Sequence, residues 1–216
     1  MKRHQLLRYA HSFASLLLVS GVFSTQLAAS NPVRIVRVEE DWELKVLTPD
    51  TNSAGPQVTC ILSPCGEVDC VYGTFELNHR SVPSYVPSGL HLQAWCGQEV
   101  VSVKSSHNTG LITTPGETVF WTQRMDLTEG VLFFEIVSGT SSTWGSFGGQ
   151  GHLKTHVNST VSDLNGYDPE VSAANSGVGY AANRVQHLIL RRVRLVTDNG
   201  QVIEYNTPRN VHVSEN

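Results

Sequence analysis

The sequence predicts an all-β protein: an antiparallel β-sandwich, of which the jelly roll is one form, with about ten strands and one long Gly-rich connection. Apolar and polar residues alternate with a period of two from residue 32 onward, as in half-buried strands. Turn-forming residues separate these segments, and no apolar pattern of helical period exceeds two turns. Strands with one buried face pack as two layers, so we expect one sandwich domain over residues 31–216.

Residues 1–30 have the three-part layout of a secretory signal peptide. Met1–Arg8 carries three positive charges and no acid, an apolar run covers Phe13–Phe23, and Ala28-Ala29-Ser30 supplies the small residues of a cleavage site. The apolar run is shorter than the roughly 20 residues that span a bilayer. We therefore expect an exported protein, located in the periplasm, the cell envelope or outside the cell, with no membrane span in the mature chain.

The charge balance argues against two classes of partner. The chain has 15 Lys and Arg against 19 Asp and Glu, a net charge of −4. Removal of residues 1–30 would take away three basic residues and leave −7. An acidic domain without a basic run is not typical of proteins that bind nucleic acid or anionic membranes.

Four cysteines remain after residue 30: Cys60, Cys65, Cys70 and Cys96. An even number in an exported chain predicts two disulfides, with three possible pairings. Cys60 with Cys70, across the intervening turn, and Cys65 with Cys96 is one arrangement. The spacing lacks the CxxC pair or nearby histidines of a zinc site.

Individual elements follow from the alternation and the turn residues. The clearest expected strands are Gln57–Leu62, Val71–His79, Leu90–Cys96, Glu99–Val103, Thr118–Leu127, Val131–Val137, Val185–Val196 and Val202–Tyr205. Strict alternation in the long strand Val185–Val196 places His187 and Arg191 on the same face as Val193. Asn199-Gly200 predicts a type I′ hairpin turn. Pro169–Asn175 is the one expected helix, with Asp168 as its N-cap.

Two of these strands predict a polar face with an aromatic residue on each. The outward set on the first strand is Tyr72, Thr74, Glu76 and Asn78, and on the second it is His91, Gln93 and Trp95. If the strands are neighbours, the face offers aromatic rings, amides and a carboxylate, which suits carbohydrate recognition. Polar outward positions are also what any solvated sheet face shows.

The stretch Gly139–Arg184 connects strand-like segments and is rich in glycine. Trp144 and Phe147 lie among its glycines and could stack on sugar rings at a binding rim. The alternative, which we favour, is that both rings close one end of the sandwich and the glycines form the turns.

Oxygen-bearing side chains at Asp163, Asn165 and Asp168 suggest either a calcium loop or a capped turn. The pattern lacks the full calcium-loop signature, so we expect no metal or other cofactor beyond this calcium candidate.

Catalytic motifs such as G-x-S-x-G are absent. Glu135 is the candidate general acid of a glycan-cleaving enzyme, if it is buried. Such an enzyme needs a second carboxyl, for which Glu76, Glu117 and Asp126 are candidates.

The runs TWGSFGGQG and LNGYDPEVSAANSGVGYAANRV, with FELNHR, FWTQRMDL and VLFFEI, resemble a group of uncharacterised secreted bacterial proteins. The resemblance covers most of the mature chain and implies export and a bacterial source, but no activity or cofactor. The leading hypothesis is therefore a non-enzymatic, exported sandwich that binds a ligand, most plausibly a glycan. The alternatives are a polysaccharide hydrolase or lyase, and a structural component of the cell envelope.

Overall fold

The computed structural model describes residues 32–47, 56–68, 71–78, 89–107, 116–143 and 145–214. The predicted signal peptide, Cys70 and Trp144 lie outside these ranges. No helix in the described ranges is long and apolar enough to cross a membrane.

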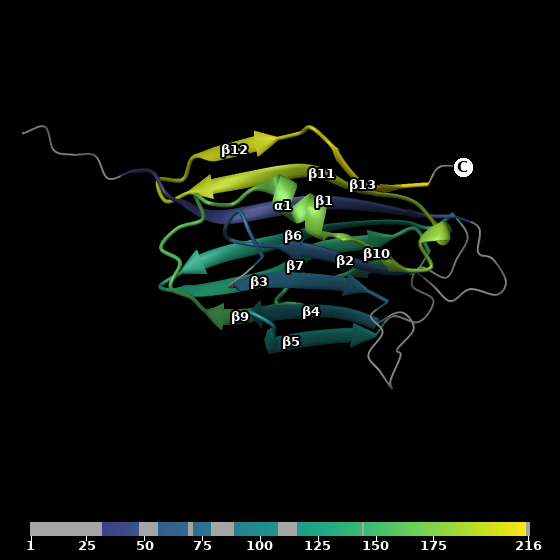
Figure 1. Cartoon of the computed structure of the whole chain (residues 1–216), viewed down its shortest axis with the longest axis horizontal. Helices are drawn as coiled ribbons and strands as arrows, with labels where there is room; N and C mark the ends of the chain where they lie inside the picture. The colour runs from purple at the N-terminus through teal and green to yellow at the C-terminus, as the bar shows by residue number, and fades with distance from the viewer. Residues whose placement is uncertain are drawn as a thin grey trace, which may run out of the picture. The chain divides into compact units, whose positions relative to one another are not determined.

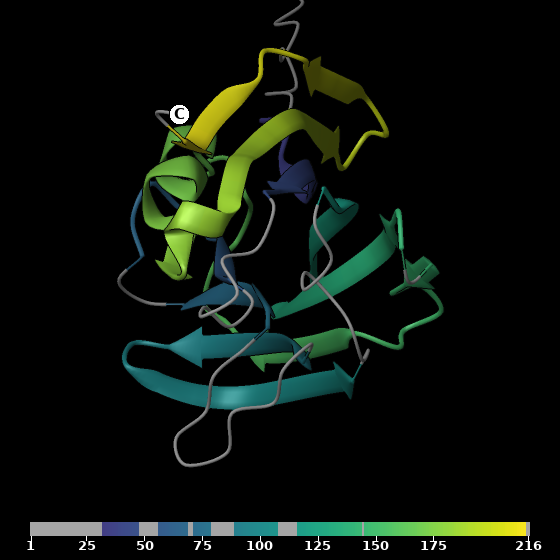
Figure 2. The same ribbon diagram turned by 90° about the vertical axis from the view of Figure 1, so that its right-hand side faces the viewer.

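The described residues form a β-sandwich, as predicted, with thirteen strands in two antiparallel sheets (Figure 1; Figure 2). The larger sheet has the order β12-β11-β1-β6-β7-β8, with β13 also paired to β11 and β9 to β7. Its strands are β1 (Ile35–Val46), β6 (Thr118–Thr128), β7 (Val131–Ser141), β8 (Gly145–Phe147), β9 (Lys154–Asn158), β11 (Val185–Thr197), β12 (Val202–Tyr205) and β13 (Arg209–Val213). The smaller sheet has the order β10-β2-β3-β4-β5. Its strands are β2 (Gln57–Leu62), β3 (Val71–Leu77), β4 (Gly89–Cys96), β5 (Glu99–His107) and β10 (Gly177–Tyr180).

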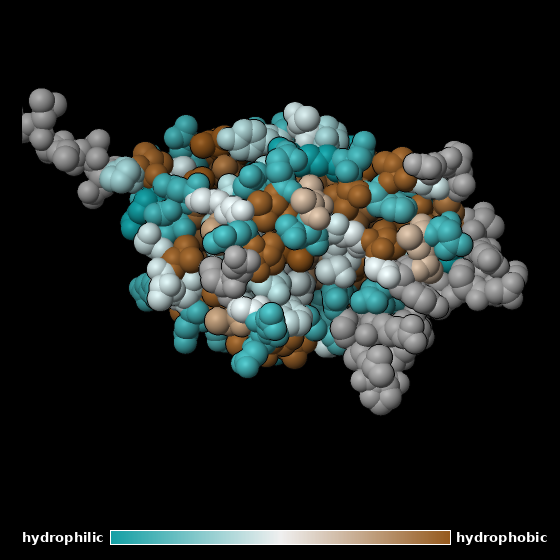
Figure 3. All heavy atoms as spheres, viewed as in Figure 1, coloured by the Kyte–Doolittle hydropathy of each residue, from teal (hydrophilic) through white to brown (hydrophobic). Residues whose placement is uncertain are grey.

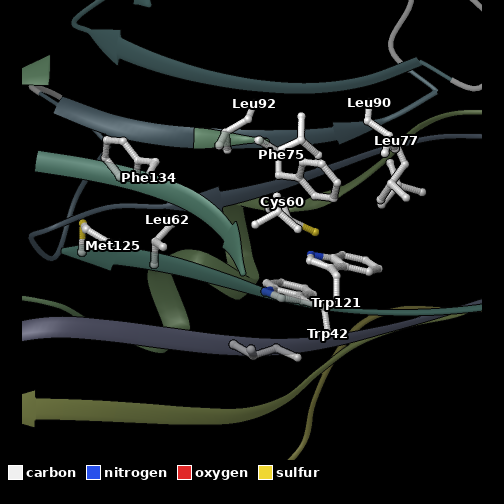
Figure 4. Close-up of a cluster of buried hydrophobic side chains, with 14 of the residues drawn as sticks. Trp42, Cys60, Leu62, Phe75, Leu77, Leu90, Leu92, Trp121, Met125 and Phe134 are labelled. Atoms are coloured by element: carbon white, nitrogen blue, oxygen red, sulfur yellow. The ribbon is translucent and has the colours of Figure 1, made fainter. Parts of the chain in front are cut away.

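The core lies between the two sheets and is built by the alternating inward residues (Figure 4). Trp42 of β1 stacks on Trp121 of β6 with ring centroids 6.1 Å apart, and Phe75 of β3 meets Trp121 at 5.9 Å. These rings join the two layers. Each buried aromatic side chain removes about 150–250 Å² from water, so the cluster stabilises the sandwich strongly.

The predicted helix α1 spans Pro169–Asn175 and packs beside β2 and β13. Asp168 has extended backbone and its carboxylate accepts the Glu170 N–H at 2.9 Å, so it is the N-cap that the sequence indicates. A 3-10 turn, η1 (Ala182–Arg184), leads into β11.

The Gly-rich connection is more ordered than the sequence indicates, because β8, β9 and β10 lie within it and raise the strand number above ten. Phe147 is buried and stacks on Phe75 at 6.2 Å, so it belongs to the core and not to a binding rim. A Cβ atom at Gly139 would overlap the Phe147 ring, which explains that glycine. Burial of Phe147 thus favours a structural role for this ring over the glycan-stacking one.

One hairpin turn differs from expectation. Asn199 does not have positive φ, and Gly200 alone has φ +83 with its N–H bonded to the Thr197 carbonyl. This is a type I turn followed by a glycine bulge, so the type I′ prediction was wrong there. The two positive φ values of a type I′ turn occur instead at Glu129 and Gly130, between β6 and β7.

The long strand β11 also departs from strict alternation. In its ladder with β1, Arg192 faces Asp41 and Leu190 faces Trp42, so Arg191 is an extra, bulged residue. The inward set changes phase there: Leu190 is buried before the bulge and Val193 after it. The prediction that Arg191 shares a face with Val193 was therefore wrong.

The disulfide prediction is not supported. Cys60, Cys65 and Cys96 are all free thiols, which rules out both the Cys65–Cys96 and the Cys60–Cys70 bridges in this structure. The register explains the result for Cys60, because Phe75 stands opposite it on β3. Cys60 is fully buried among apolar side chains, and burial raises the pKa of its thiol well above the usual value.

Candidate ligand-binding site

The structure brings the predicted polar face together on the outer side of the smaller sheet. β3 and β4 are neighbours, and their register sets Tyr72 opposite Trp95, Thr74 opposite Gln93, and Glu76 opposite His91. Figure 3 shows the side of the molecule on which these strands lie, with polar and apolar side chains interleaved. Period-two alternation was sufficient to place these six side chains.

The aromatic pair on this face is fixed by hydrogen bonds. The rings of Tyr72 and Trp95 are parallel within 3° and 5.9 Å apart. The Trp95 indole N–H lies 3.0 Å from the Thr74 hydroxyl and 3.1 Å from the Gln93 carbonyl oxygen, and it donates to both. The Tyr72 hydroxyl donates to the Gly97 carbonyl at 3.4 Å. The polar groups of the pair are thus used within the protein, and both residues remain partly exposed.

Three other predicted ligand-binding residues, one expected on this face and two in the Gly-rich stretch, do not join it. Asn78 is buried with φ 60, and its amide donates to the Pro56 carbonyl at 3.2 Å, because β3 ends at Leu77. Phe147 lies in the core, and Trp144 is outside the described residues.

A concave groove lies on the outer side of the larger sheet, where the sequence did not indicate a site. Its volume is about 480 Å³, within the range of ligand-binding clefts. The lining residues are Asp41, Trp42, Phe120, Trp121, Thr122, Ser138, Gly139, Thr140, Arg191, Arg192, Asn206 and Pro208. They come from β1, β6, β7 and β11 and from the segment between β12 and β13.

Two β-bulges flank the groove and help to determine which side chains line it. The bulge at Arg191 allows two consecutive arginines to line it, which regular alternation forbids. On the opposite side, the β6–β7 register shifts between Thr122 and Gln123, next to Ser138. Beside Arg191, pairing to β11 passes from β12 to β13, and the residues between these strands supply Asn206 and Pro208.

The floor of the groove is a fixed hydrogen-bonded network. The Asp41 carboxylate accepts the Thr122 hydroxyl at 2.7 Å and the Arg192 Nε–H at 2.7 Å. Arg191 is paired with Glu43, which also lies 3.0 Å from His187. Burial raises the pKa of Glu43, but the hydrogen bonds from Arg191 and His187 outweigh it and hold the pKa below its usual value. Every charged side chain of the floor thus forms an ion pair with a side chain of opposite charge.

One apolar platform stands among these polar groups. Phe120 of β6 is 42% exposed although it is a large hydrophobic residue on a sheet face that is otherwise rich in ion pairs. The exposed Ser138 and Thr140 lie on the neighbouring strand β7, where Thr140 is directly opposite Phe120. The groove therefore combines a ring surface with hydroxyl, carboxylate, guanidinium and amide groups.

Two of the candidate catalytic acids, Glu135 and Asp126, form ion pairs with the same arginine. Glu135 is 7% exposed, and its carboxylate lies 2.7 Å from Arg124 and 3.7 Å from Lys154. Asp126 lies 2.7 Å from the same Arg124. The Glu135 carboxylate is thus engaged by two cationic side chains.

Glu117 and the calcium candidates have structural partners. Glu117 is buried and accepts a hydrogen bond from Ser141. Asp163 accepts the Asn165 N–H at 3.0 Å, and Asn165 accepts the Ile35 N–H at 2.8 Å. Together with the Asp168 cap, these bonds are those of a capped turn. Within the described ranges, no group of three His, Cys, Asp or Glu side chains is placed to hold a metal ion.

The sequence matches no protein-family model, and no curated relative is found. Solved structures do match. One is the crystal structure of ancestral congerin Con-anc, with a TM-score of 0.31 and 10% identity, over 76% of this chain and 96% of that chain. The evidence for the site therefore comes from this chain's own residues.

Proposed function

We propose that this protein binds a neutral glycan chain non-covalently in the groove over β1, β6, β7 and β11. The observation that carries the proposal is the exposed Phe120 ring beside a fixed array of hydroxyl, carboxylate and guanidinium groups in a concavity of about 480 Å³. Sugar rings have apolar faces that stack on aromatic carbon and hydroxyl rims that exchange hydrogen bonds.

The charge pattern of the floor favours an uncharged ligand. Arg191 and Arg192 are already paired with Glu43 and Asp41, so an anionic ligand would have to compete with protein carboxylates. The paired groups still have unused donors and acceptors, since a guanidinium has five N–H groups and a carboxylate about four acceptor sites. Sugar hydroxyls can use both kinds without disturbing the ion pairs.

Export of the protein, which the first thirty residues predict, would give it access to glycans of the envelope or the surroundings. The mildly acidic charge of the chain fits a neutral glycan better than an acidic one. The proposal includes no metal and no bond cleavage.

The test is binding of the mature chain to a panel of neutral and acidic oligosaccharides by glycan array, followed by calorimetry with the best neutral ligand. We expect Phe120→Ala to weaken binding about tenfold, the effect of losing about 1.4 kcal/mol of stacking. Val202→Ala is the matched control, because Val202 is equally exposed, at 43%, but lies outside the groove. Failure of every neutral glycan to bind, or unchanged affinity in Phe120→Ala, would contradict the proposal.

The Tyr72–Trp95 pair is a second candidate surface for the same class of ligand. It is favoured by one observation: both rings are held in place by hydrogen bonds to the protein, so little side-chain entropy is lost on stacking. Trp95→Ala separates the two surfaces. If glycan binding is lost in Trp95→Ala and retained in Phe120→Ala, the smaller sheet is the site.

A further inference from the structure

Strand β5 forms one edge of the smaller sheet, and no described strand pairs with its outer side. It is a long edge of nine residues, Glu99–His107. An unpaired edge offers a row of backbone N–H and C=O groups to another strand, and proteins usually protect such edges. The side chains of β5 determine which kind of strand can pair with this edge.

Apolar side chains are concentrated on this strand. Val100 is 43% exposed, Val101 is 49% and Val103 is 49%, so β5 holds three of the eight large hydrophobic residues that are exposed in the described ranges. The patch continues onto the half-exposed Trp95, which pairs with Val100 across β4 and β5. Figure 3 shows apolar surface at the lower margin, where β5 runs in Figure 1. An isolated monomer gains nothing from exposing these valines.

Strand β5 is complementary to a second copy of itself that runs antiparallel to it. A register that sets Glu99 of one copy opposite Lys104 of the other also sets Val100 opposite Val103, and the two-fold axis repeats both pairs. Residues that face each other across an antiparallel ladder must lie on the same side of the sheet. In the β4–β5 ladder, Val100 and Val103 stand opposite the outward residues Trp95 and Gln93. Glu99 and Lys104 stand opposite Cys96 and Leu92, which belong to the other side.

A β-bulge makes this match possible. The β4–β5 register shifts between Ala94 and Trp95, which leaves Val101 as an extra residue. The extra residue changes the phase between Val100 and Val103, which would otherwise lie on opposite sides. In the proposed pairing, the extra Val101 of each copy lies next to the two-fold axis. Both strands therefore change phase at the same place, and the residues that face each other beyond the bulges still lie on the same side of the sheet.

We infer that two copies of this chain associate through antiparallel pairing of their β5 strands, with Glu99 facing Lys104 and Val100 facing Val103 in each half. The occupant of the edge is thus a second copy, which joins two five-stranded sheets into one. Lysine and a bulge on an edge strand normally discourage pairing. In this register the lysine meets a carboxylate and the bulges coincide, so partners other than a second copy are disfavoured.

Sedimentation equilibrium of the mature protein over a concentration series tests the inference. Glu99 and Lys104 are exposed, so exchanging their charges leaves the monomer fold intact. We expect Glu99→Lys and Lys104→Glu each to raise the dimer dissociation constant about tenfold, because each creates two like-charge contacts. The double variant, Glu99→Lys with Lys104→Glu, restores opposite charges and should return the dissociation constant to the wild-type range.

Weakening in both single variants with recovery in the double variant supports the inference. A wild-type protein that is monomeric at the highest concentration at which it stays soluble overturns it. A dimer that the single variants leave unchanged, or that the double variant fails to restore, also overturns it, since the interface would then lie elsewhere or have another register.

Discussion

Glu40 gives the sharpest test of how the core is held together. It lies on the inward face of β1, is fully buried, and its carboxylate accepts hydrogen bonds from three side chains. The distances are 3.0 Å to the Trp42 indole N–H, 2.7 Å to the Gln123 amide and 2.6 Å to the Tyr167 hydroxyl. The carboxylate thus joins both β1 and β6 to the segment that leads into α1.

Replacement by alanine should destabilise the protein strongly. Glu40→Ala leaves the Trp42, Gln123 and Tyr167 donors without their acceptor, and each buried donor left unsatisfied costs about 1–3 kcal/mol. Release of a buried charge offsets part of this loss, so we expect a net destabilisation of about 3 kcal/mol. Urea unfolding of the mature chain at pH 7 measures it, with Glu204→Ala at the half-exposed Glu204 as the control.

Glutamine should have the opposite effect at neutral pH. Its carbonyl oxygen can accept from Trp42 and Gln123, and its amide can donate to the Tyr167 oxygen. Burial raises the pKa of Glu40 above its usual value, so keeping it ionised in the folded state costs stability. In the wild type this cost is absent below the unfolded-state pKa and grows as the pH rises toward the raised folded-state pKa.

Glu40→Gln should therefore match the wild type near pH 4 and be the more stable of the two at pH 7–8. The measurement is the free energy of unfolding of both proteins across that range. If the alanine variant lies within about 0.5 kcal/mol of the wild type, or if glutamine destabilises as much as alanine at pH 7, the description of this network is wrong.

Three further predictions concern packing, capping and thiol access. Gly73→Ala should destabilise by about 1–3 kcal/mol, because its Cβ would overlap a buried aromatic ring of β7, whereas Gly177→Ala meets no atom within 4 Å and should have little effect in the same thermal melts. Asp168→Ala should cost about 1 kcal/mol through loss of the helix N-cap, and an unchanged melting temperature would contradict the capping role. In mass-spectrometric alkylation of the native protein, exposed Cys96 should react and buried Cys60 should react only after unfolding; early labelling of Cys60 would contradict its burial.

Much of the fold could be predicted because several of its strands alternate regularly between buried and outward residues. The bounds of β2, β12 and α1 were predicted residue for residue, and the outward sets of β3 and β4 were right except at Asn78, where the strand has ended. These elements depend on local rules: period-two burial, and a proline and an aspartate at a helix start. The same rules gave the wrong turn type at Asn199, because the turn residues there are compatible with two turn types.

The groove could not be predicted in the same way, because it depends on strand order. β6 and β7 form a hairpin, but β1 pairs with β6 and with β11, which are distant from it in the sequence, and these pairings bring Ser138 and Arg192 to one surface. One signal was present and missed: the apolar positions of β11 change phase between Leu190 and Val193, which indicates an extra residue. A second was Phe120, a large apolar residue at an outward position of β6.

Backbone amide chemical shifts during titration with the best neutral oligosaccharide test the central claim most directly. Glycan binding in the groove predicts that the largest changes occur at Phe120 and Thr122 on β6 and at Arg192 on β11, the two strands that flank β1 in the larger sheet. Changes confined to Tyr72 and Trp95, on the opposite layer, would contradict the assignment of the groove as the binding site.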